Sequence, residues 1–272
     1  MGYVMLSRVE TIEQLYIQGD PPDNKFYADQ RALDELERLE KVSVNKNKPN
    51  WEQNFAWCRK IALLNCRSLA SHIEDIKHDF MLLHSDIICL NETWLMSNLV
   101  QEHWNIPGYH LHLNSVGSGK GIGTYIKADI ITPKSNVTKE KVQITLLSSP
   151  ELDIINIYRS QGMDTAELAN DLRYMINKSK LTIVCGDLNL CYIDDYNNEL
   201  TKMFKREGFQ QLVHEATHFM GGHIDQVYSN HNPQEYQVHV SLYSPYYLAK
   251  DHDAILITIT KVPPKSSRQK RK

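Results

Sequence analysis

Short apolar runs recur along the chain from residue 61 onward, and most of them end in polar or ionisable residues. Runs of this kind, bounded by turn residues and rich in Ile, Leu, Val and Tyr, are typical of buried β-strands. The strands predicted in this way span residues 61–64, 86–90, 109–113, 121–126, 142–147, 152–158, 181–185, 224–228, 236–243 and 254–259. Strands therefore dominate the chain beyond residue 60.

Helical patterns are fewer than strand patterns. Four apolar residues fall on one face of a helix that we expect after the first strand: Ile73, Ile76, Phe80 and Leu83. Two further helices are predicted over residues 164–177 and 198–207. Many strands with few helices between them favour two sheets that pack together with helices outside. The predicted fold class is therefore α/β, of the α+β sandwich type, with two packed mixed β-sheets flanked by helices.

The two ends of the chain differ from this region, so the sequence divides into four parts. Residues 1–19 form an N-terminal segment with a strand-like start. Residues 20–59 open with a cluster of turn residues, take on a helical composition and then become polar, which predicts a helix and a linker. Residues 60–262 form the predicted folded domain. Residues 263–272 are a basic tail that we expect to be disordered, either simply solvated or serving as a nuclear localisation signal or phosphate-contacting arm.

The composition indicates a soluble protein. Of the 272 residues, 42% are hydrophobic, yet no run approaches the roughly 18 apolar residues that a membrane span needs. The N-terminus lacks the basic-then-apolar pattern of a secretion signal. The five cysteines form no CxxC pair, and Cys89 and Cys185 lie inside apolar runs, which suits reduced thiols. We therefore expect no membrane partner, no secretion, and a nuclear or cytoplasmic location.

Charge is unevenly distributed along the chain. The formal net charge is −3, but residues 61–262 carry 16 Lys+Arg against 23 Asp+Glu, while residues 263–272 carry five basic residues and no acid. An acidic body argues against tight, nonspecific binding of duplex DNA by charge alone. It suits a site that holds a divalent cation.

The segment 181–190 carries the first candidate chemistry, because an apolar run leads into Gly186, Asp187 and Asn189. Side chains two residues apart in an extended chain point to the same side, so this carboxylate and this amide can face one ligand together. Strand carboxyl ends are also where ligands collect in open α/β sheets. A strand followed by an ordinary Asx turn is the alternative interpretation of this segment taken alone.

Other strand boundaries carry polar groups as well. They supply Asn65, Asn91 with Glu92, Tyr158, Asp225, and Asp251 with His252. One polar junction carries little information, since loops are polar in general. Six junctions that together supply carboxylates, amides, a phenol and an imidazole make a set suited to hydrolysis assisted by a divalent metal.

Six motifs resemble those of the endonuclease/exonuclease/phosphatase superfamily, and they occur in the family order. They are Asn65 with Arg67-Ser68-Leu69, Ile88-Cys89-Leu90-Asn91-Glu92-Thr93-Trp94, Ile157-Tyr158, Gly186-Asp187-Leu188-Asn189, Ile224-Asp225-Gln226-Val227, and Asp251-His252. The resemblance covers about Lys60 to Ile259. It implies the four-layer fold and the phosphate-ester chemistry of this superfamily, which includes apurinic/apyrimidinic endonucleases, retrotransposon endonucleases and inositol-polyphosphate phosphatases.

The resemblance also implies a metal site. Glu92 is the first choice of ligand, supported by Asn65 and with Asp251 close by. The expected ion is Mg²⁺, which prefers one or two carboxylates together with water and substrate phosphate oxygens. Mn²⁺ is the alternative ion.

Catalytic roles follow from the same resemblance. Asp187 would orient or deprotonate the attacking water, aided by Asn189. Tyr158 would donate a hydrogen bond to a phosphate oxygen. His252, oriented by the carboxylate of Asp225, would act at the scissile phosphate as an acid/base group or as a hydrogen-bond donor.

The wording of several motifs is most similar to endonucleases of eukaryotic mobile elements of the LINE type, in particular "LNCRSL", "LNETWL" and "GIGTYIK". Residues 3–9 and 13–17 resemble the last motif of superfamily-one DNA helicases of the Pif/RecD type. A helicase followed by such an endonuclease is similar to rolling-circle Helitron elements. The chain contains no GxxxxGK[ST] phosphate loop, so we expect no binding of ATP.

The expected function is a metal-dependent DNA endonuclease that nicks a phosphodiester bond and leaves a 3′-hydroxyl, with DNA as its partner. Arg67 stands where repair-type apurinic endonucleases carry an acid, and Lys250 replaces a small serine before the Asp-His pair. Both departures from the family pattern argue against specificity for abasic sites, and a basic residue near the rim would help hold backbone phosphate of ordinary DNA. Two alternatives remain. One is a phosphatase of the same fold that acts on inositol or lipid phosphates, and the other is a domesticated DNA-binding module without catalysis.

Overall fold

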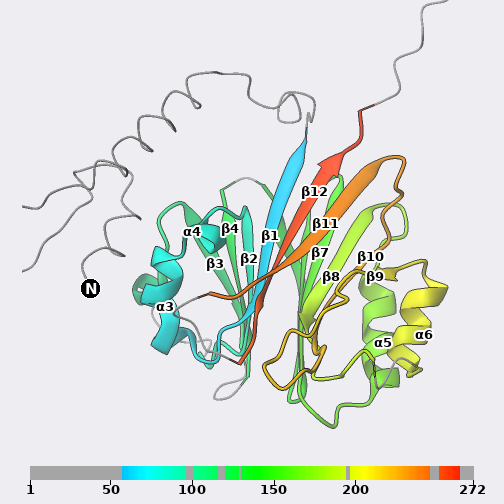
Figure 1. The fold of residues 1–272 in the computed structure, drawn as a ribbon, viewed down its shortest axis with the longest axis horizontal. Coiled ribbons are helices and arrows are strands. Elements are labelled where there is room, and N and C mark those ends of the chain that lie inside the picture. Colours follow the sequence, from blue (N-terminus) through cyan, green and yellow to red (C-terminus); the bar gives the residue numbers. More distant parts are fainter. Residues whose placement is uncertain are drawn as a thin grey trace, which may run out of the picture. The chain divides into compact units, whose positions relative to one another are not determined.

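The computed structural model of the chain describes residues 57–95, 101–115, 120–128, 130–193, 197–245 and 251–263 (Figure 1). The predictions for residues 1–19, for nearly all of the linker over 20–59 and for the basic tail fall outside the described residues. Within them, two six-stranded sheets pack against each other and helices cover their outer faces. This arrangement confirms the predicted sandwich of two mixed sheets.

The first sheet has the strand order β11-β12-β1-β2-β4-β3. Its strands are β1 (Cys58–Asn65), β2 (Ile87–Asn91), β3 (Tyr109–Asn114), β4 (Ile122–Lys127), β11 (Tyr236–Tyr243) and β12 (Ala254–Lys261). The central pair β1 and β2 runs parallel, and the other neighbours run antiparallel. The carboxyl ends of β1 and β2 therefore meet at the same edge of this sheet.

The second sheet has the strand order β5-β6-β7-β8-β10-β9. Its strands are β5 (Thr132–Lys139), β6 (Val142–Ser148), β7 (Leu152–Arg159), β8 (Leu181–Asp187), β9 (Gln210–Gln211) and β10 (Asp225–Ser229). It repeats the plan of the first sheet, because β7 and β8 form one parallel pair and the remaining pairs are antiparallel. Each sheet thus brings two strand ends together at its centre.

The main hydrophobic core lies between the two sheets. Along β1, Ile61 and Leu63 belong to this inner core with residues of β8 such as Ile183. Ala62 and Leu64 alternate with them and pack on the outer face, under the neighbouring helix. This alternation has the two-residue period of a strand, and because both faces are covered the run reads as continuously apolar in the sequence.

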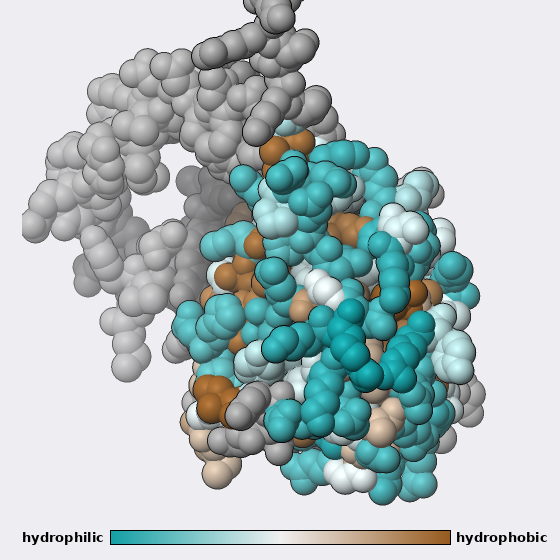
Figure 2. Space-filling view, turned by 90° about the vertical axis from the view of Figure 1, so that its right-hand side faces the viewer, coloured by the Kyte–Doolittle hydropathy of each residue, from teal (hydrophilic) through white to brown (hydrophobic). Residues whose placement is uncertain are grey.

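Helices cover the outer face of each sheet. They are α3 (Leu69–His78), α4 (Phe80–Leu83), α5 (Thr165–Met175) and α6 (Glu199–Arg206), with a short 3-10 helix η3 (Gln101–Trp104). The helices α3 and α4 lie outside the first sheet, and α5 and α6 lie outside the second (Figure 1). The face that carries α5 and α6 is mostly hydrophilic (Figure 2). None of the helices in the described ranges is long and apolar enough to cross a membrane.

The prediction of one continuous helical face from Ile73 to Leu83 is wrong. Asp79 adopts an extended conformation that ends α3, and its carboxylate accepts a hydrogen bond from Leu82 N at the start of α4. Phe80 consequently begins a new helix and is 67% exposed, whereas Ile73 and Ile76 pack in the core. The apolar spacing fitted a single helix, but the capping aspartate interrupts it.

The sequence did not predict two strands, β5 and β9. The sequence of β5 is TPKSNVTK, which is polar, and most of its side chains are exposed. It lies at the edge of its sheet, where proline and charged residues are common because one side of the strand stays unpaired. The strand β9 has only two residues and offers no pattern to detect.

Candidate active site

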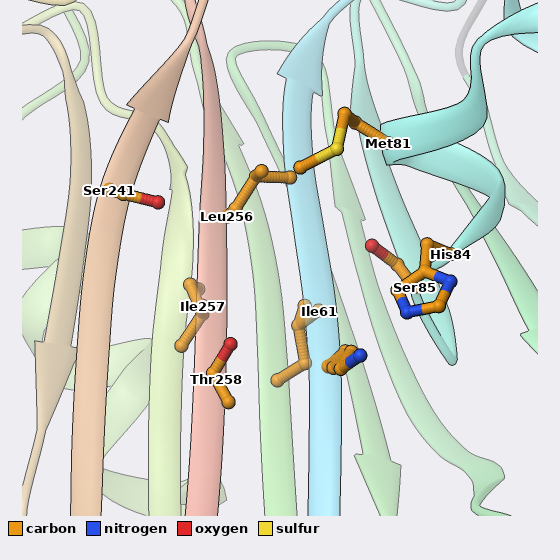
Figure 3. A pocket seen from close by; sticks show the side chains of 9 residues that line it. Ile61, Met81, His84, Ser85, Ser241, Leu256, Ile257 and Thr258 are labelled. Atoms are coloured by element: carbon orange, nitrogen blue, oxygen red, sulfur yellow. The ribbon is translucent and has the colours of Figure 1, made fainter. Parts of the chain in front are cut away.

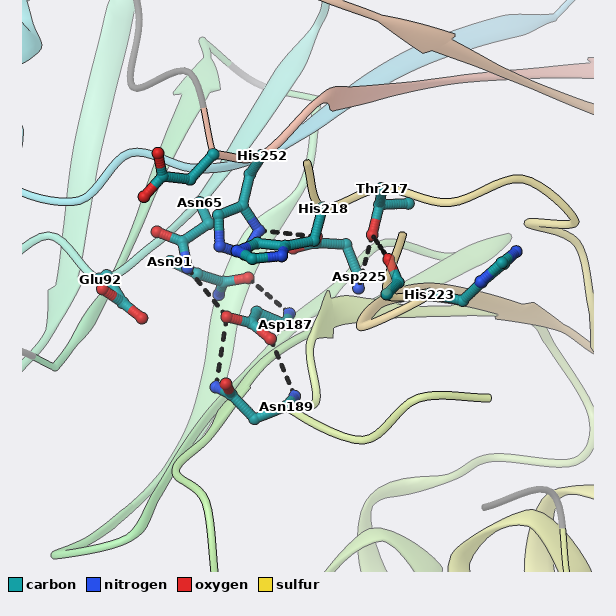
Figure 4. Close-up of polar contacts among 12 residues, drawn as sticks. Asn65, Asn91, Glu92, Asp187, Asn189, Thr217, His218, His223, Asp225 and His252 are labelled. Atoms are coloured by element: carbon teal, nitrogen blue, oxygen red, sulfur yellow. Dashed lines mark hydrogen bonds and ion pairs between the residues drawn. The ribbon is translucent and has the colours of Figure 1, made fainter. Parts of the chain in front are cut away.

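The carboxyl ends of β1, β2, β7 and β8 form the candidate site. In the first sheet Asn65 pairs with Asn91 across β1 and β2. In the second sheet Asp187, the last residue of β8, lies between Tyr158 of β7 and Asp225 of β10. Because each pair sits at the end of neighbouring strands, residues distant in sequence reach one edge of the sandwich (Figure 4).

Asp187 is the centre of this group and is fully buried. Its carboxylate accepts hydrogen bonds from Asn65 Nδ2 (2.8 Å), Asn189 N (2.8 Å) and Asn189 Nδ2 (3.3 Å). Burial and the nearby charge of Asp225 raise the pKa of Asp187, whereas the charge of His252 and these hydrogen bonds lower it. The net direction is upward, which suits a carboxylate that takes a proton from water.

Gly186 is required by a close approach of two strands. A Cβ atom at this position would lie 1.8 Å from the carbonyl oxygen of Ile157 in β7. The residue lies inside β8, so its role is to let β8 and β7 approach each other. Asp187, at the end of β8, is therefore held directly against β7.

His252 and Asp225 form a buried pair beside Asp187. His252 Nδ1 donates to Asp225 Oδ2 at 2.8 Å, which leaves Nε2 for another partner. Ligand atoms of Asp187, Asp225 and His252 lie within 4.8 Å of one another. Burial alone would lower the pKa of His252, but the hydrogen bond and charge of Asp225, with the charges of Asp187 and Glu92, raise it above its usual value.

Glu92 and Tyr158 face each other across the two sheets. Tyr158 Oη donates to Glu92 Oε1 (3.3 Å), and Trp94 Nε1 donates to Glu92 Oε2 (3.3 Å). Burial, reinforced by the charges of Glu92 and Asp187, raises the pKa of Tyr158, so its hydroxyl stays protonated and can donate. Both contacts to Glu92 are long, and its half-exposed carboxylate retains lone pairs for a further ligand.

Asp251 reaches the same edge from the segment before β12. It forms an ion pair with Arg67, which follows Asn65 after β1. Arg67 is 45% exposed, so its charge lies at the rim of the site.

The donors fit a hard divalent cation. The carboxylates of Glu92 and Asp251 and the side-chain carbonyl of Asn65 are oxygen donors, the class that Mg²⁺ and Mn²⁺ prefer. Asp225 Oδ1 adds a buried oxygen that has no hydrogen-bond partner among the described residues. A buried, unpaired carboxylate oxygen is costly unless a ligand satisfies it.

Strained backbone surrounds the same edge. The non-glycine residues with positive φ in the described ranges are Arg67 (38°), Ser68 (90°), Glu92 (51°), Trp94 (56°) and Asn189 (46°). All of them lie within three residues of the carboxyl end of β1, β2 or β8. Such conformations are uncommon for side chains larger than glycine, and they concentrate at functional sites. Their position supports this edge as the active site.

Three residues of the site received no catalytic or metal-binding role from the sequence. Asn91 is fully buried and its Oδ1 accepts a hydrogen bond from Asp187 N (2.8 Å). Arg159 donates from Nη1 to the carbonyl oxygens of Leu188 (2.8 Å) and Asn189 (3.2 Å). His218 lies against His252. Asn91 and Arg159 each adjoin a candidate residue, whereas no sequence signal marks His218.

A pocket elsewhere on the molecule is a weaker candidate. It lies beside the first half of β1, between α4 and the strands β12 and β11, and is lined by Ile61, Met81 and Leu256 among others (Figure 3). Its walls are largely apolar, with no carboxylate among the lining residues. It therefore lacks the groups needed for hydrolysis of a phosphate ester.

Comparisons with known proteins agree with this geometry. The model of the endonuclease/exonuclease/phosphatase family matches residues 62–246. No curated protein matches the chain in sequence.

Solved structures share the fold. An AP endonuclease from Archaeoglobus fulgidus is 16% identical with a TM-score of 0.57, covering 75% of this chain and 100% of that chain. A 3′-5′ exonuclease from Neisseria meningitidis is 15% identical with a TM-score of 0.59, covering 73% and 98%. The endonuclease domain of TRAS1, a telomere-specific non-LTR retrotransposon, is 11% identical with a TM-score of 0.56, covering 75% and 98%. At these identities the likeness establishes the fold.

Proposed function

Because the chain belongs to the endonuclease/exonuclease/phosphatase family, we propose that it is a divalent-metal-dependent DNA endonuclease that hydrolyses a phosphodiester bond and leaves a 3′-hydroxyl end. The observation that carries the proposal is the arrangement around Asp187. Its carboxylate is fixed by Asn65 and Asn189, and it lies beside the pair formed by His252 and Asp225. A buried base next to an imidazole can activate water and hold a phosphate in one site.

Asp187 is the proposed base. Three hydrogen bonds fix the orientation of its carboxylate, and the upward direction of its pKa favours acceptance of a proton from water. Asn189 has a second role, because its side-chain amide also donates to Arg159 O (2.9 Å) and so keeps the loop after β8 in place. Positioning of this kind lowers the entropic cost of bringing water to the phosphate.

His252 and Tyr158 are the proposed phosphate ligands. Asp225 holds the His252 ring through Nδ1 and raises its pKa, so the protonated ring can donate from Nε2 to a phosphate oxygen or protonate the leaving oxygen. Tyr158 keeps its proton and can donate from its hydroxyl. Donors fixed in advance stabilise the negative charge that develops on the phosphate.

Glu92, Asn65 and Asp251 would hold the metal, with Mg²⁺ as the expected ion and Mn²⁺ as the alternative. When bound, a divalent cation supplies Lewis-acid stabilisation of phosphate charge. Glu92 is the principal proposed ligand, since its two long hydrogen bonds can be replaced by a stronger oxygen–metal contact.

DNA without a base lesion is the proposed substrate. Arg67 at the rim can contact a backbone phosphate, and such contacts position nucleic acid without reading its sequence. The mobile-element origin proposed for the chain draws support from the helicase-like residues 3–17 and from the motif wording around Asn65 and Glu92. The genomic sequence around this reading frame tests that origin, since a Helitron should place a complete helicase with its phosphate loop directly upstream.

Nicking of supercoiled plasmid tests the proposed activity. The protein should convert closed plasmid to the open form with Mg²⁺ and fail to do so with a chelator, and a DNA polymerase should extend the nicks from their 3′-hydroxyl ends. Asp187→Ala should reduce the rate by about 10² to 10⁴. The matched control is Asp171→Ala on the surface of α5, which should nick normally.

Other outcomes would identify the alternatives. Plasmid left closed by the unmutated protein, together with phosphate release from inositol phosphates, would replace the endonuclease by a phosphatase. DNA binding without either reaction would indicate a module that has lost catalysis.

A further inference from the structure

The loop between β9 and β10 brings a second histidine to the site. His218 N and Thr217 N both donate to Gly222 O (3.0 Å each), and Gly221 N donates to His218 O (2.8 Å). These bonds close a tight turn, and Gly221 allows it with a φ of +84°. The backbone around His218 is thus fixed before any ligand binds.

This turn is tied to the residues that carry the His252–Asp225 pair. Asp253 N donates to Thr217 O (2.8 Å) and Phe219 N donates to Asp251 O (2.9 Å), so that His218 and His252 form a β-bridge. Thr217 Oγ1 also accepts a hydrogen bond from Asp225 N (3.1 Å). The same turn therefore orients Asp225 and places His218.

The two imidazole rings lie against each other. Their centroids are 4.9 Å apart and the rings meet at 72°, edge to face (Figure 4). The His218 ring is half-buried, so it remains open to a ligand on one side. A group bound at the His252 ring could therefore also be within reach of the His218 ring.

Hydrogen bonding sets the tautomer of His218. Its Nδ1 lies 3.4 Å from Met220 N, which can only donate, so in the neutral ring the proton is on Nε2. No residue in the described ranges accepts from that Nε2. The neutral ring therefore presents an N–H donor beside His252. Burial and the charge of His252 also lower the pKa of His218, which favours this neutral form.

We propose that His218 is a further catalytic residue, which donates a hydrogen bond from Nε2 to the substrate phosphate next to His252. The inference rests on the proposed phosphodiester hydrolysis. Two donors on one phosphate divide its negative charge, and the backbone bonds of the turn fix the second donor in advance. The competing explanation is that the His218 ring only packs on His252 and keeps it in place.

Two substitutions separate these roles. His218→Phe keeps a flat ring against His252 but removes the donor, and His218→Gln removes the ring but keeps an N–H group. A donor role predicts that kcat for plasmid nicking falls by about 10² in His218→Phe and largely recovers in His218→Gln. A packing role predicts the reverse order. Thermal unfolding of both variants shows whether each is folded, and a folded His218→Phe variant with the rate of the unmutated protein would overturn the proposal.

A second readout does not depend on DNA cleavage. In protein labelled with ¹⁵N-histidine, NMR should find the neutral His218 proton on Nε2, and this resonance should shift when thymidine 5′-monophosphate is added together with Mg²⁺. An unchanged resonance, or a proton on Nδ1, would overturn the role of His218. If the protein fails to nick plasmid but the resonance shifts, the endonuclease assignment fails while the phosphate contact of His218 stands.

Discussion

The side chain of Asn91 accepts a hydrogen bond from the backbone N–H of Asp187 at 2.8 Å. Asn91 ends β2 in the first sheet, whereas Asp187 ends β8 in the second, so this bond joins the two sheets at the edge that carries the candidate site. The Asn91 amide also donates to Asn156 Oδ1 (3.1 Å) and Ile157 O (3.0 Å). One buried side chain thus fixes the position of the proposed base relative to both sheets.

Asn91→Ala should therefore damage both stability and activity. It removes the acceptor of the buried Asp187 N–H and the donor to the Ile157 carbonyl, which should lower the free energy of unfolding by about 2 to 3 kcal/mol. The nicking rate should fall as well, because the carboxylate of Asp187 loses its fixed position. Urea unfolding and plasmid nicking measure the two effects.

Asn114 provides a matched control for Asn91. It is a second buried asparagine between the sheets, and it donates to Ile144 O (2.9 Å) and Val137 O (3.1 Å). It belongs to β3, away from the candidate residues. Asn114→Ala should cost similar stability yet leave kcat nearly unchanged in the remaining folded protein. Equal losses of kcat in both variants would show that Asn91 has no special role at the site.

Arg159 should act as a positioning residue. Its guanidinium donates to the carbonyl oxygens of Leu188, Asn189 and Met163, and thereby holds the loop that carries Asn189. Lysine has one ammonium group and cannot span three carbonyls in the same way. Arg159→Lys should lower kcat by about tenfold to hundredfold with little change in KM. Arg173→Lys on the surface of α5 is the control, and a kcat of Arg159→Lys equal to that of this control would argue against the positioning role.

The His252–Asp225 pair should make stability depend on pH. The pKa of His252 is raised in the folded protein. The stabilisation that His252 provides is therefore fully present below the pKa of the unfolded chain, and it is lost as pH rises through the pKa in the folded protein. The difference in stability between the unmutated protein and His252→Gln, measured in urea with a chelator, should therefore be larger at pH 6 than at pH 9.

His231 supplies a control of opposite sign. Burial lowers the pKa of His231, so the stability that the neutral His231 side chain provides is lost as pH falls. The stability difference between the unmutated protein and His231→Gln should be smaller at acid pH than at pH 9. Parallel pH curves for the two variants would show that the Asp225 contact does not raise the pKa of His252.

Most residues that the structure brings together in the candidate site could be named from the sequence, because the ends of strands are recognisable there. Asn65 and Asp187 end short apolar runs and Asp225 begins one. The parallel pairs β1–β2 and β7–β8, and the antiparallel pair β8–β10, bring these residues to one edge. The roles of Asn91 and Glu92 could not be separated in this way. The two are adjacent, and only the register of β2 against β1 shows that Asn91 points into the interface while Glu92 faces the site.

Other features depend on contacts that leave no pattern in the sequence. His218 lies in an irregular loop, and it reaches His252 because backbone bonds join the turn at Thr217 to the segment at Asp253. The end of α3 depends on one capping aspartate, Asp79, inside a run whose apolar spacing fits a continuous helix. The polar edge strand β5 is recognisable only from its pairing with β6.

Gly186 should tolerate no larger residue. A Cβ atom would lie 1.8 Å from the Ile157 carbonyl oxygen, and the backbones of β7 and β8 would have to separate to admit it. Gly186→Ala should lower the free energy of unfolding by more than about 4 kcal/mol. Gly208→Ala is the control, since its Cβ meets nothing within 4 Å and only its φ of +80° is unfavourable, which should cost about 1 to 2 kcal/mol. Circular dichroism during urea unfolding measures both, and similar losses would contradict the close approach of the strands.

Phe219 and Met220 should contact DNA. They follow His218 on the turn beside His252, and they are 69% and 78% exposed. Large apolar side chains at the edge of a site mark a binding surface, and aromatic rings can stack on bases. Replacing both with serine should weaken DNA binding by about tenfold, measured by fluorescence anisotropy in an Asp187→Ala background. Tyr174→Ser is the control, because Tyr174 is 93% exposed on α5, a helix that contributes no residue to the site. Unchanged affinity in the double variant would place the DNA elsewhere on the molecule.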